Sequence, residues 1–304
     1  FSRWDSGQIL MSKILRNRIN KQKNNLLETK YIDAIKESIK SLVDQDPSLL
    51  ATLLTLPGFS ELESSFDEAN PIKIYQECLD FQVSIGNKLS KDLHLSVKKI
   101  IANINKAWPQ GKGERKLLGT IWAYLALIGD VKVKRICVDS IGNSSMTIAR
   151  AALAALKPLD CKETAEASCL FYDLWKNNPV VLDSWFSYEA SRSHSQTIDV
   201  VEKLLLHPKF DMKAPNSIRA VLGGFSKNIE SFHSIDGSGY QFMAEKIVEV
   251  DKLNPITASR MVKVFNKWKT YIKQNKEEMY KAILRINNAN ISSNTREVVQ
   301  LLLN

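Results

Sequence analysis

A short loop carries the residue types of a nucleophile, a base and an acid. His233 precedes the run Asp236-Gly237-Ser238-Gly239-Tyr240, and serine, histidine and aspartate together can perform acyl transfer. Catalytic triads are assembled across a fold, however, and neighbouring side chains on one tight loop rarely point together. We therefore expect a glycine turn here, with Ser238 or Asp236 capping a helix that starts near Tyr240.

The histidines lack the spacing of a metal site. A zinc peptidase needs two histidines one helical turn apart with a glutamate between them, so that both imidazoles face the metal and the carboxylate activates its water. The chain has no such pattern, and its four histidines, His94, His194, His207 and His233, are isolated from one another and from the cysteines. We predict surface or capping roles for them, and no catalytic residue, metal ligand or cofactor in this chain.

Two arginines are placed to reach a surface. In a helix that starts near Asn216, Arg219 lies about 100° from Ile218, at the flank of the apolar stripe. In a helix opened by Asn254-Pro255, Arg260 lies roughly opposite the apolar stripe. Both guanidinium groups could offer planar, bidentate donors to a carboxylate or a carbonyl. Ordinary surface arginines are the alternative reading of the same spacing.

Helices must position these residues, because helix starts and helical periodicity recur along the chain. An Asx side chain followed by proline caps a first turn, since the proline needs no donor there. This dipeptide occurs at Asp46-Pro47, Asn70-Pro71, Asn178-Pro179 and Asn254-Pro255. Three more caps are predicted where a polar residue is followed three positions later by Glu; these caps are Ser60, Asp160 and Asn294.

Apolar residues between these starts follow the helical period. Ile218, Val221, Leu222 and Phe225 are one example, and Ala258, Met261, Val262 and Phe265 are another. No comparable stretch alternates with period two, and no linker rich in Gly, Ser or Pro divides the chain. We predict roughly fourteen to sixteen helices in one all-α body over residues 1–304, an α-solenoid or superhelix of stacked antiparallel helix pairs of HEAT or armadillo type.

Charge and hydropathy make two classes of partner, nucleic acid and the membrane, unfavoured. The net charge of +9 comes with basic clusters that are interrupted by acidic residues, and no nucleic-acid recognition motif accompanies them, so nucleic acid is an unfavoured partner. The clusters include Lys13 to Lys23, Lys112 to Lys116 and Lys263 to Lys276. The strongest apolar run, Leu117–Ile128, is too short for a membrane span of roughly 18 residues or more, so it predicts a buried helix.

Short motifs are spread over the whole chain and are densest in its final third. They are Phe1-Ser2-Arg3-Trp4-Asp5 with Gln8, Leu54-Thr55-Leu56-Pro57, Phe66-Asp67, Trp175, Asp183, Trp185-Phe186, His207-Pro208-Lys209-Phe210, Asn216-Ser217-Ile218-Arg219, Phe232-His233, Asp236-Gly237-Ser238-Gly239-Tyr240, Asn254-Pro255 and Ala258-Ser259-Arg260. Together they resemble the C-terminal helical domain of bacterial aminopeptidase N, a zinc gluzincin family.

The resemblance implies a function that the spacing alone does not. Enzymes of this family remove N-terminal amino acids from peptides in the cytoplasm, in peptide catabolism, and a separate thermolysin-like domain carries their zinc. The chain resembles only the helical domain that covers the active-site cavity, so the catalytic domain, the β-domains and the zinc are expected on another part of the same polypeptide. By the same resemblance, Arg219 and Arg260 face that cavity, where peptide substrates bind, and Asn216 assists them.

Two functions therefore compete. The first is the cover of a zinc aminopeptidase, inactive in isolation and read as an excised piece because the chain begins at Phe1. The second is a helical-repeat scaffold or a nucleic-acid-binding solenoid with no peptidase partner. A His-Glu-x-x-His segment upstream in the same gene would favour the first, and salt-sensitive DNA binding would favour the second.

Overall fold

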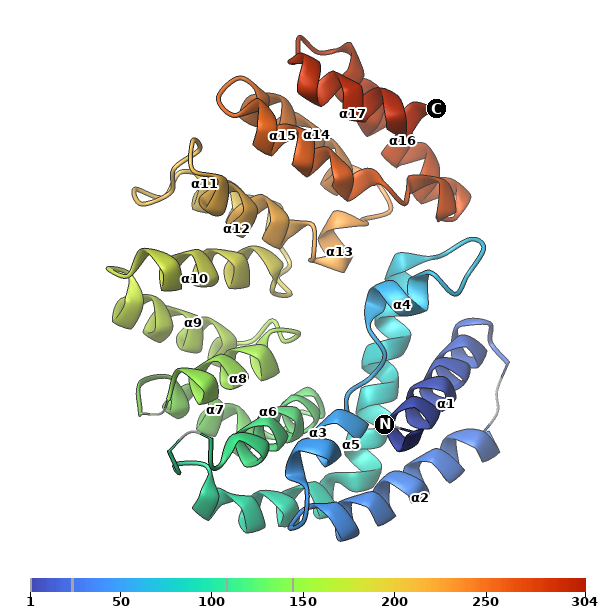
Figure 1. The fold of residues 1–304 in the computed structure, drawn as a ribbon, viewed down its shortest axis with the longest axis vertical. Helices are drawn as coiled ribbons and strands as arrows, with labels where there is room; N and C mark the ends of the chain where they lie inside the picture. Colours follow the sequence, from blue (N-terminus) through green and yellow to red (C-terminus); the bar gives the residue numbers. More distant parts are fainter. Residues whose placement is uncertain (1, 23–24, 108, 144) are drawn as a thin grey trace. The chain divides into compact units, whose positions relative to one another are not determined.

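The computed structural model describes residues 2–22, 25–107, 109–143 and 145–304, and most of these residues lie in α-helices (Figure 1). Phe1 and Lys23, which contributed to the sequence predictions, lie outside the described residues. The described part contains no β-strand beyond one isolated bridge between Ala69 and Tyr271. The prediction of an all-α protein is confirmed.

The described helices follow one another closely, and all but one have 18 residues or fewer. In chain order they are α1 (Ser2–Ile19), α2 (Asn25–Leu42), α3 (Pro47–Leu53), α4 (Phe59–Glu63), α5 (Pro71–Ile100), α6 (Lys112–Leu127), α7 (Val131–Asn143), α8 (Met146–Leu156), α9 (Lys162–Trp175), α10 (Pro179–Ser191), α11 (Thr197–Leu205), α12 (Pro215–Phe225), α13 (Ile229–Phe232), α14 (Ser238–Asp251), α15 (Pro255–Met261), α16 (Lys273–Asn288) and α17 (Ser293–Leu303). Three 3-10 helices, Ile101–Asn103, Val262–Phe265 and Trp268–Thr270, complete the described elements. No described helix combines the length and apolarity needed to cross a membrane.

The chain divides into two compact units. One consists of residues 1–62 and 73–171, and the other of residues 63–72 and 172–304. The second unit thus takes a short segment from early in the chain and the whole final part. The prediction of a single domain over residues 1–304 stays a prediction.

In the first unit, α6 is the central helix and packs against α3 and α8. It contains most of the apolar run predicted to form a buried helix, and Leu117, Ile121 and Leu125 are fully buried. Arg115 at its start donates to the carbonyl oxygens of Ile104 and Lys106, each at 2.9 Å. These bonds give both carbonyl oxygens a partner and hold the preceding loop against the start of α6.

In the second unit, helices pack as successive pairs. Helix α10 packs against α12, α14 against both α15 and α16, and α17 against α15 and α16; Figure 1 shows α14 beside α15 and α16 beside α17. The two apolar stripes predicted from the period are buried, which confirms them; they are Ile218, Val221, Leu222 and Phe225, and Ala258, Met261, Val262 and Phe265. The stripe of α15 continues through the 3-10 turn Val262–Phe265, which keeps its side chains in the core.

The Asx-Pro starts are confirmed. Helices also begin near the three starts predicted from a later Glu, but the predicted cap residues are wrong. All four prolines begin helices, and the side chains of Asp46, Asn178 and Asn254 accept from the amide three residues on. Of the others, Ser60 and Asn294 lie inside α4 and α17, and α9 begins two residues after Asp160. The spacing of a polar residue and a later Glu therefore located these helix starts to within two residues but did not identify the cap residue.

Candidate functional site

Helix α12 places Asn216 and Arg219 at the surface. The helix begins at Pro215, and its apolar stripe is buried, which leaves Arg219 exposed on the flank. Arg219 Nη2 donates to Asn216 Oδ1 at 2.6 Å, and Arg219 Nε donates to the carbonyl oxygen of Pro215 at 3.1 Å. Two of the three residues predicted for the site are therefore in direct contact, and their contact holds the guanidinium over the first turn.

Helix α15 places Arg260 at the surface of the same unit. Asn254 Oδ1 accepts from the amide of Thr257 at 3.0 Å, which caps the helix and fixes its rotation, and Ala258 and Met261 face the core. The Arg260 side chain is exposed and forms no hydrogen bond or ion pair with any described residue. Helices α12 and α15 pack against one another, but the structure shows no hydrogen bond between Arg260 and the pair Asn216 and Arg219.

These three residues can bind a ligand but cannot transfer a proton. A guanidinium donates in a planar fork that suits carboxylate and carbonyl oxygens, and it stays charged at any physiological pH. The asparagine amide is not titratable. Within the described ranges, no three His, Cys, Asp or Glu side chains lie together in a way that could hold a metal ion.

The loop between α13 and α14 does not form a catalytic triad. Ser238 donates through its hydroxyl and its amide to Asp236 Oδ1, at 2.8 and 3.0 Å. His233 instead pairs with Tyr240, whose hydroxyl lies 2.7 Å from Nδ1. The predicted glycine turn is confirmed, since Gly237 has φ of 74° and directly precedes α14.

His233 lies at the centre of a buried polar network. Only 4% of its surface is exposed, and burial lowers its pKa to about 3, so the ring is neutral. Asn275 Nδ2 donates to the Tyr240 hydroxyl oxygen at 2.9 Å, so that hydroxyl is free to donate its proton to His233 Nδ1. The chain of donors runs from the amide through the phenol to the imidazole.

A second buried group holds the segment 63–72 onto its unit. Glu63 is 4% exposed, and its carboxylate accepts hydrogen bonds from the Tyr271 hydroxyl and the Lys267 ammonium group. Burial is the main cause that raises the pKa of Tyr271 well above its usual value, and the hydrogen bond to Glu63 raises it further. The phenol therefore stays protonated and remains a donor. The bridge beside it adds two backbone bonds, from Ala69 to Thr270 at 2.8 Å and from Ile272 to Ala69 at 3.0 Å.

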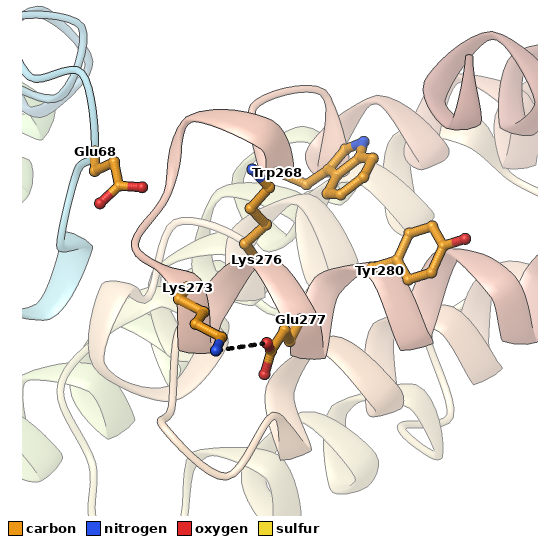
Figure 2. A pocket seen from close by; sticks show the side chains of 6 residues that line it. All are labelled: Glu68, Trp268, Lys273, Lys276, Glu277 and Tyr280. Carbon is orange, nitrogen blue, oxygen red and sulfur yellow. Dashed lines mark ion pairs between the residues drawn. The ribbon is translucent and has the colours of Figure 1, made fainter.

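Next to this bridge lies a cleft of about 450 Å³ (Figure 2). Its lining residues come from the 64–70 loop, the turn before α16 and the first turns of α16: Glu68, Trp268, Lys273, Lys276, Glu277 and Tyr280. The rings of Trp268 and Tyr280 stack with their centroids 5.3 Å apart and an interplanar angle of 30°. None of Asn216, Arg219 and Arg260 lines it.

Comparison with known proteins connects this architecture to a family. A family model described as "Domain of unknown function (DUF3458_C) ARM repeats" matches residues 1–304. The chain belongs to the DUF3458_C family of ARM repeats. ARM repeats are stacked helical units, so the predicted α-solenoid of HEAT or armadillo type is confirmed.

Aminopeptidases N are among the relatives of this DUF3458_C chain. The protein from Escherichia coli is 28% identical over 295 residues, which cover 93% of this chain and 33% of the relative. The protein from Haemophilus influenzae is 26% identical over 291 residues, which cover 94% of this chain and 33% of the relative. The protein from Caulobacter vibrioides is 26% identical over 328 residues, which cover 100% of this chain and 36% of the relative. The predicted resemblance to the C-terminal helical domain of bacterial aminopeptidase N is confirmed, and the chain spans about a third of the length of these relatives.

A solved structure agrees with the sequence relatives. The crystal structure of Legionella pneumophila aminopeptidase A in complex with aspartic acid superposes with a TM-score of 0.88 at 28% identity, covering 99% of this chain and 36% of that one. The DUF3458_C fold therefore occurs as one part of a longer aminopeptidase chain in that protein.

Sequence reasoning missed the Glu63 group and the cleft of this DUF3458_C chain. Glu63 was assigned to a capping box, but its partners Lys267 and Tyr271 lie more than two hundred residues later in the sequence. Trp268 and Lys276 belong to a stretch that was read only as a basic cluster. The short spacing of Trp268, Lys276 and Tyr280 is visible in the sequence, but only the fold brings Glu68 beside them.

Replacing Lys267 by methionine is expected to lower the free energy of unfolding of the second unit by about 1 to 2 kcal/mol. The nearly buried Glu63 carboxylate would lose its cation, while Lys267 is 40% exposed, so solvent moderates the loss. Urea unfolding, monitored through hydrogen exchange of the α16 amides, measures this change in the free energy of unfolding. Lys263, exposed and without an ion pair among the described residues, provides the matched Lys263→Met control, which should be neutral.

A double variant separates the ion pair from packing. When Glu63→Gln is combined with Lys267→Met, the buried charge disappears, and part of the lost stability should return. If the double variant is as unstable as the sum of the two single variants, the two side chains do not interact energetically, and the ion pair does not hold residues 63–72 in place.

Proposed function

We propose that this chain is the helical cover of a zinc-dependent aminopeptidase N and has no catalytic centre of its own. One observation carries the proposal: aminopeptidases N from three bacteria match 93% or more of the chain, yet the chain covers only 33% to 36% of them. The whole enzyme would remove N-terminal amino acids from peptides in the cytoplasm, as part of peptide catabolism. The partner of this chain is then the catalytic domain of its own polypeptide.

In this proposal the helical domain restricts access to the active-site cavity and binds the distant end of the peptide. Arg219 and Arg260 are exposed on neighbouring helices, and a guanidinium suits the peptide's carboxyl terminus or a backbone carbonyl. Asn216 holds Arg219 through the 2.6 Å hydrogen bond and so acts as a positioning residue. The interactions orient the substrate, which lowers the entropic cost of reaction.

The zinc expected for this family does not fit the described part of this chain. No three potential ligands lie together there, and the sequence contains no His-Glu-x-x-His pattern. In this proposal these residues contribute substrate binding and restricted access, and the chemical step takes place on the catalytic domain.

Replacing both Arg219 and Arg260 by alanine in the complete enzyme is expected to raise KM for short peptides about tenfold, with kcat nearly unchanged. The reason is that the lost bonds would hold the carboxyl end of the substrate, which takes no part in the chemistry. Steady-state kinetics over peptides of increasing length measure the effect. An amino-acyl reporter without a carboxylate should be unaffected.

Arg150 supplies the matched control, because it is an exposed helical arginine of the other unit. Arg150→Ala should leave all substrates unchanged. Kinetics of the double variant that are unchanged at every peptide length would refute the role proposed for the arginines. A kcat that falls equally for peptides and the reporter would also refute it.

A further inference from the structure

The charges lining the cleft beside the Ala69 bridge do not all neutralise one another. Lys273 and Glu277 form an ion pair at 3.9 Å, which Figure 2 marks across the first turn of α16. The side chains of Glu68 and Lys276, by contrast, form no ion pair or hydrogen bond with any described residue. The cleft thus offers one free carboxylate and one free ammonium group.

The aromatic wall of the cleft is held in place. The Trp268 indole Nε1 donates to the carbonyl oxygen of Leu302 at 3.0 Å, so its polar edge is satisfied within the protein. Its ring stacks on Tyr280, and together the two side chains present an apolar surface to the cleft. A ligand can bury apolar area there without leaving the indole N–H unpaired.

Glu68 is held beside this wall by the backbone. The next residue, Ala69, forms both bonds of the bridge to the segment around Tyr271, and the Glu63 group holds the start of the same loop. Figure 2 shows Glu68 on a separate segment, across the cleft from Lys276 and the aromatic rings. The opposite charges therefore come from two segments that are fixed relative to one another within one unit.

We propose that this cleft binds a short, unblocked peptide with apolar side chains. Glu68 receives the peptide's ammonium group, Lys276 its carboxylate, and the Trp268 and Tyr280 rings its side chains. A simple anion would meet the Glu68 carboxylate, and a simple cation would meet Lys276, so a zwitterion is the ligand whose charges both find a partner. The volume of about 450 Å³ lies within the range of small-ligand sites. This inference does not depend on the function proposed for Arg219 and Arg260.

The test uses the 304-residue chain and the dipeptide Leu-Leu in isothermal titration calorimetry. We expect a Kd of about 1 mM or tighter, and about tenfold weaker binding of Gly-Gly, which lacks the apolar side chains. N-acetyl-Leu-Leu removes the ammonium charge, and Leu-Leu amide removes the carboxylate. Each blocked peptide should bind about fivefold to tenfold more weakly than Leu-Leu.

Crossing the blocked peptides with variants assigns each charge. Glu68→Gln should weaken Leu-Leu and Leu-Leu amide about fivefold, but should not change N-acetyl-Leu-Leu. Lys276→Gln should weaken Leu-Leu and N-acetyl-Leu-Leu, but should not change the amide. Glu61→Gln and Lys30→Gln alter exposed residues that do not line the cleft and should change nothing.

Three results would overturn the proposal. They are the absence of Leu-Leu binding up to about 10 mM, equal binding of the free and both blocked peptides, and competition by inorganic phosphate, which would indicate an anion site. Circular dichroism of each variant shows whether it is folded. Because the predictions concern which peptide responds to which variant, a general loss of structure would not reproduce them.

Discussion

Replacing Gly239 by alanine is expected to lower the free energy of unfolding of the second unit by about 3 kcal/mol. An added Cβ would lie 2.2 Å from the carbonyl oxygen of Ser231 and 2.6 Å from that of Phe232. Both contacts are with backbone atoms of α13, so no side-chain rotation relieves them, and α13 and α14 must separate. Urea-dependent hydrogen exchange of the α14 amides measures the change.

Gly223 provides the control for this substitution. It lies within α12, and an added Cβ would meet no atom within 4 Å. Gly223→Ala should therefore stabilise the unit by about 0.5 to 1 kcal/mol, because alanine favours the helix. Equal stability of the two alanine variants would show that the approach of α13 to α14 is not as close as described.

Lowering the pH from about 7 to about 5 is expected to cost about 2 kcal/mol of stability through His233 alone, and about 3 kcal/mol by pH 4. Burial lowers the pKa of His233 to about 3 in the folded protein, below the value of about 6.5 in the unfolded chain. The unfolded chain therefore binds the proton first. The stabilisation is fully present above about pH 6.5 and is lost as the pH falls toward 3.

The contribution of His233 is obtained as a difference between two proteins. His233→Gln removes the titrating ring but keeps an acceptor for Tyr240, and both proteins share all other titrating groups. The urea-unfolding free energy of the variant should fall less steeply with acidification, by about 2 kcal/mol between about pH 7 and about pH 5. Parallel pH profiles would contradict the assignment, whatever the absolute stability of the variant.

Local signals in this sequence predicted local structure well. The Asx-Pro dipeptides located helix starts because a cap and its proline act within one turn. The apolar period of α12 correctly predicted which face of that helix is buried. The same reasoning put Arg219 and Arg260 at the surface, and both are exposed. Their role toward a substrate came only from the family resemblance and stays a prediction.

Features that depend on contacts between residues far apart in the sequence could not be predicted from local patterns. The cap of α17 is Ser292 rather than Asn294. The Asp251 carboxylate accepts hydrogen bonds from the Ser292 amide at 2.6 Å and from the Thr295 hydroxyl at 2.5 Å. This tertiary carboxylate fixes the helix start, and nothing near Asn294 in the sequence reveals it. Glu63 and Glu68 were missed for the same reason, since their neighbours become close only in the fold.

The position of residues 63–72 has a consequence for biosynthesis. This segment leaves the ribosome before the rest of its unit, because Glu63 is separated from Lys267 by 204 residues and the unit resumes only at Tyr172. The segment therefore lacks these partners until Lys267 and Tyr271 have been translated. The second unit cannot close cotranslationally in the order of its sequence, and a ribosome stalled before Lys267 would carry a nascent chain whose Glu63 still lacks both of its partners.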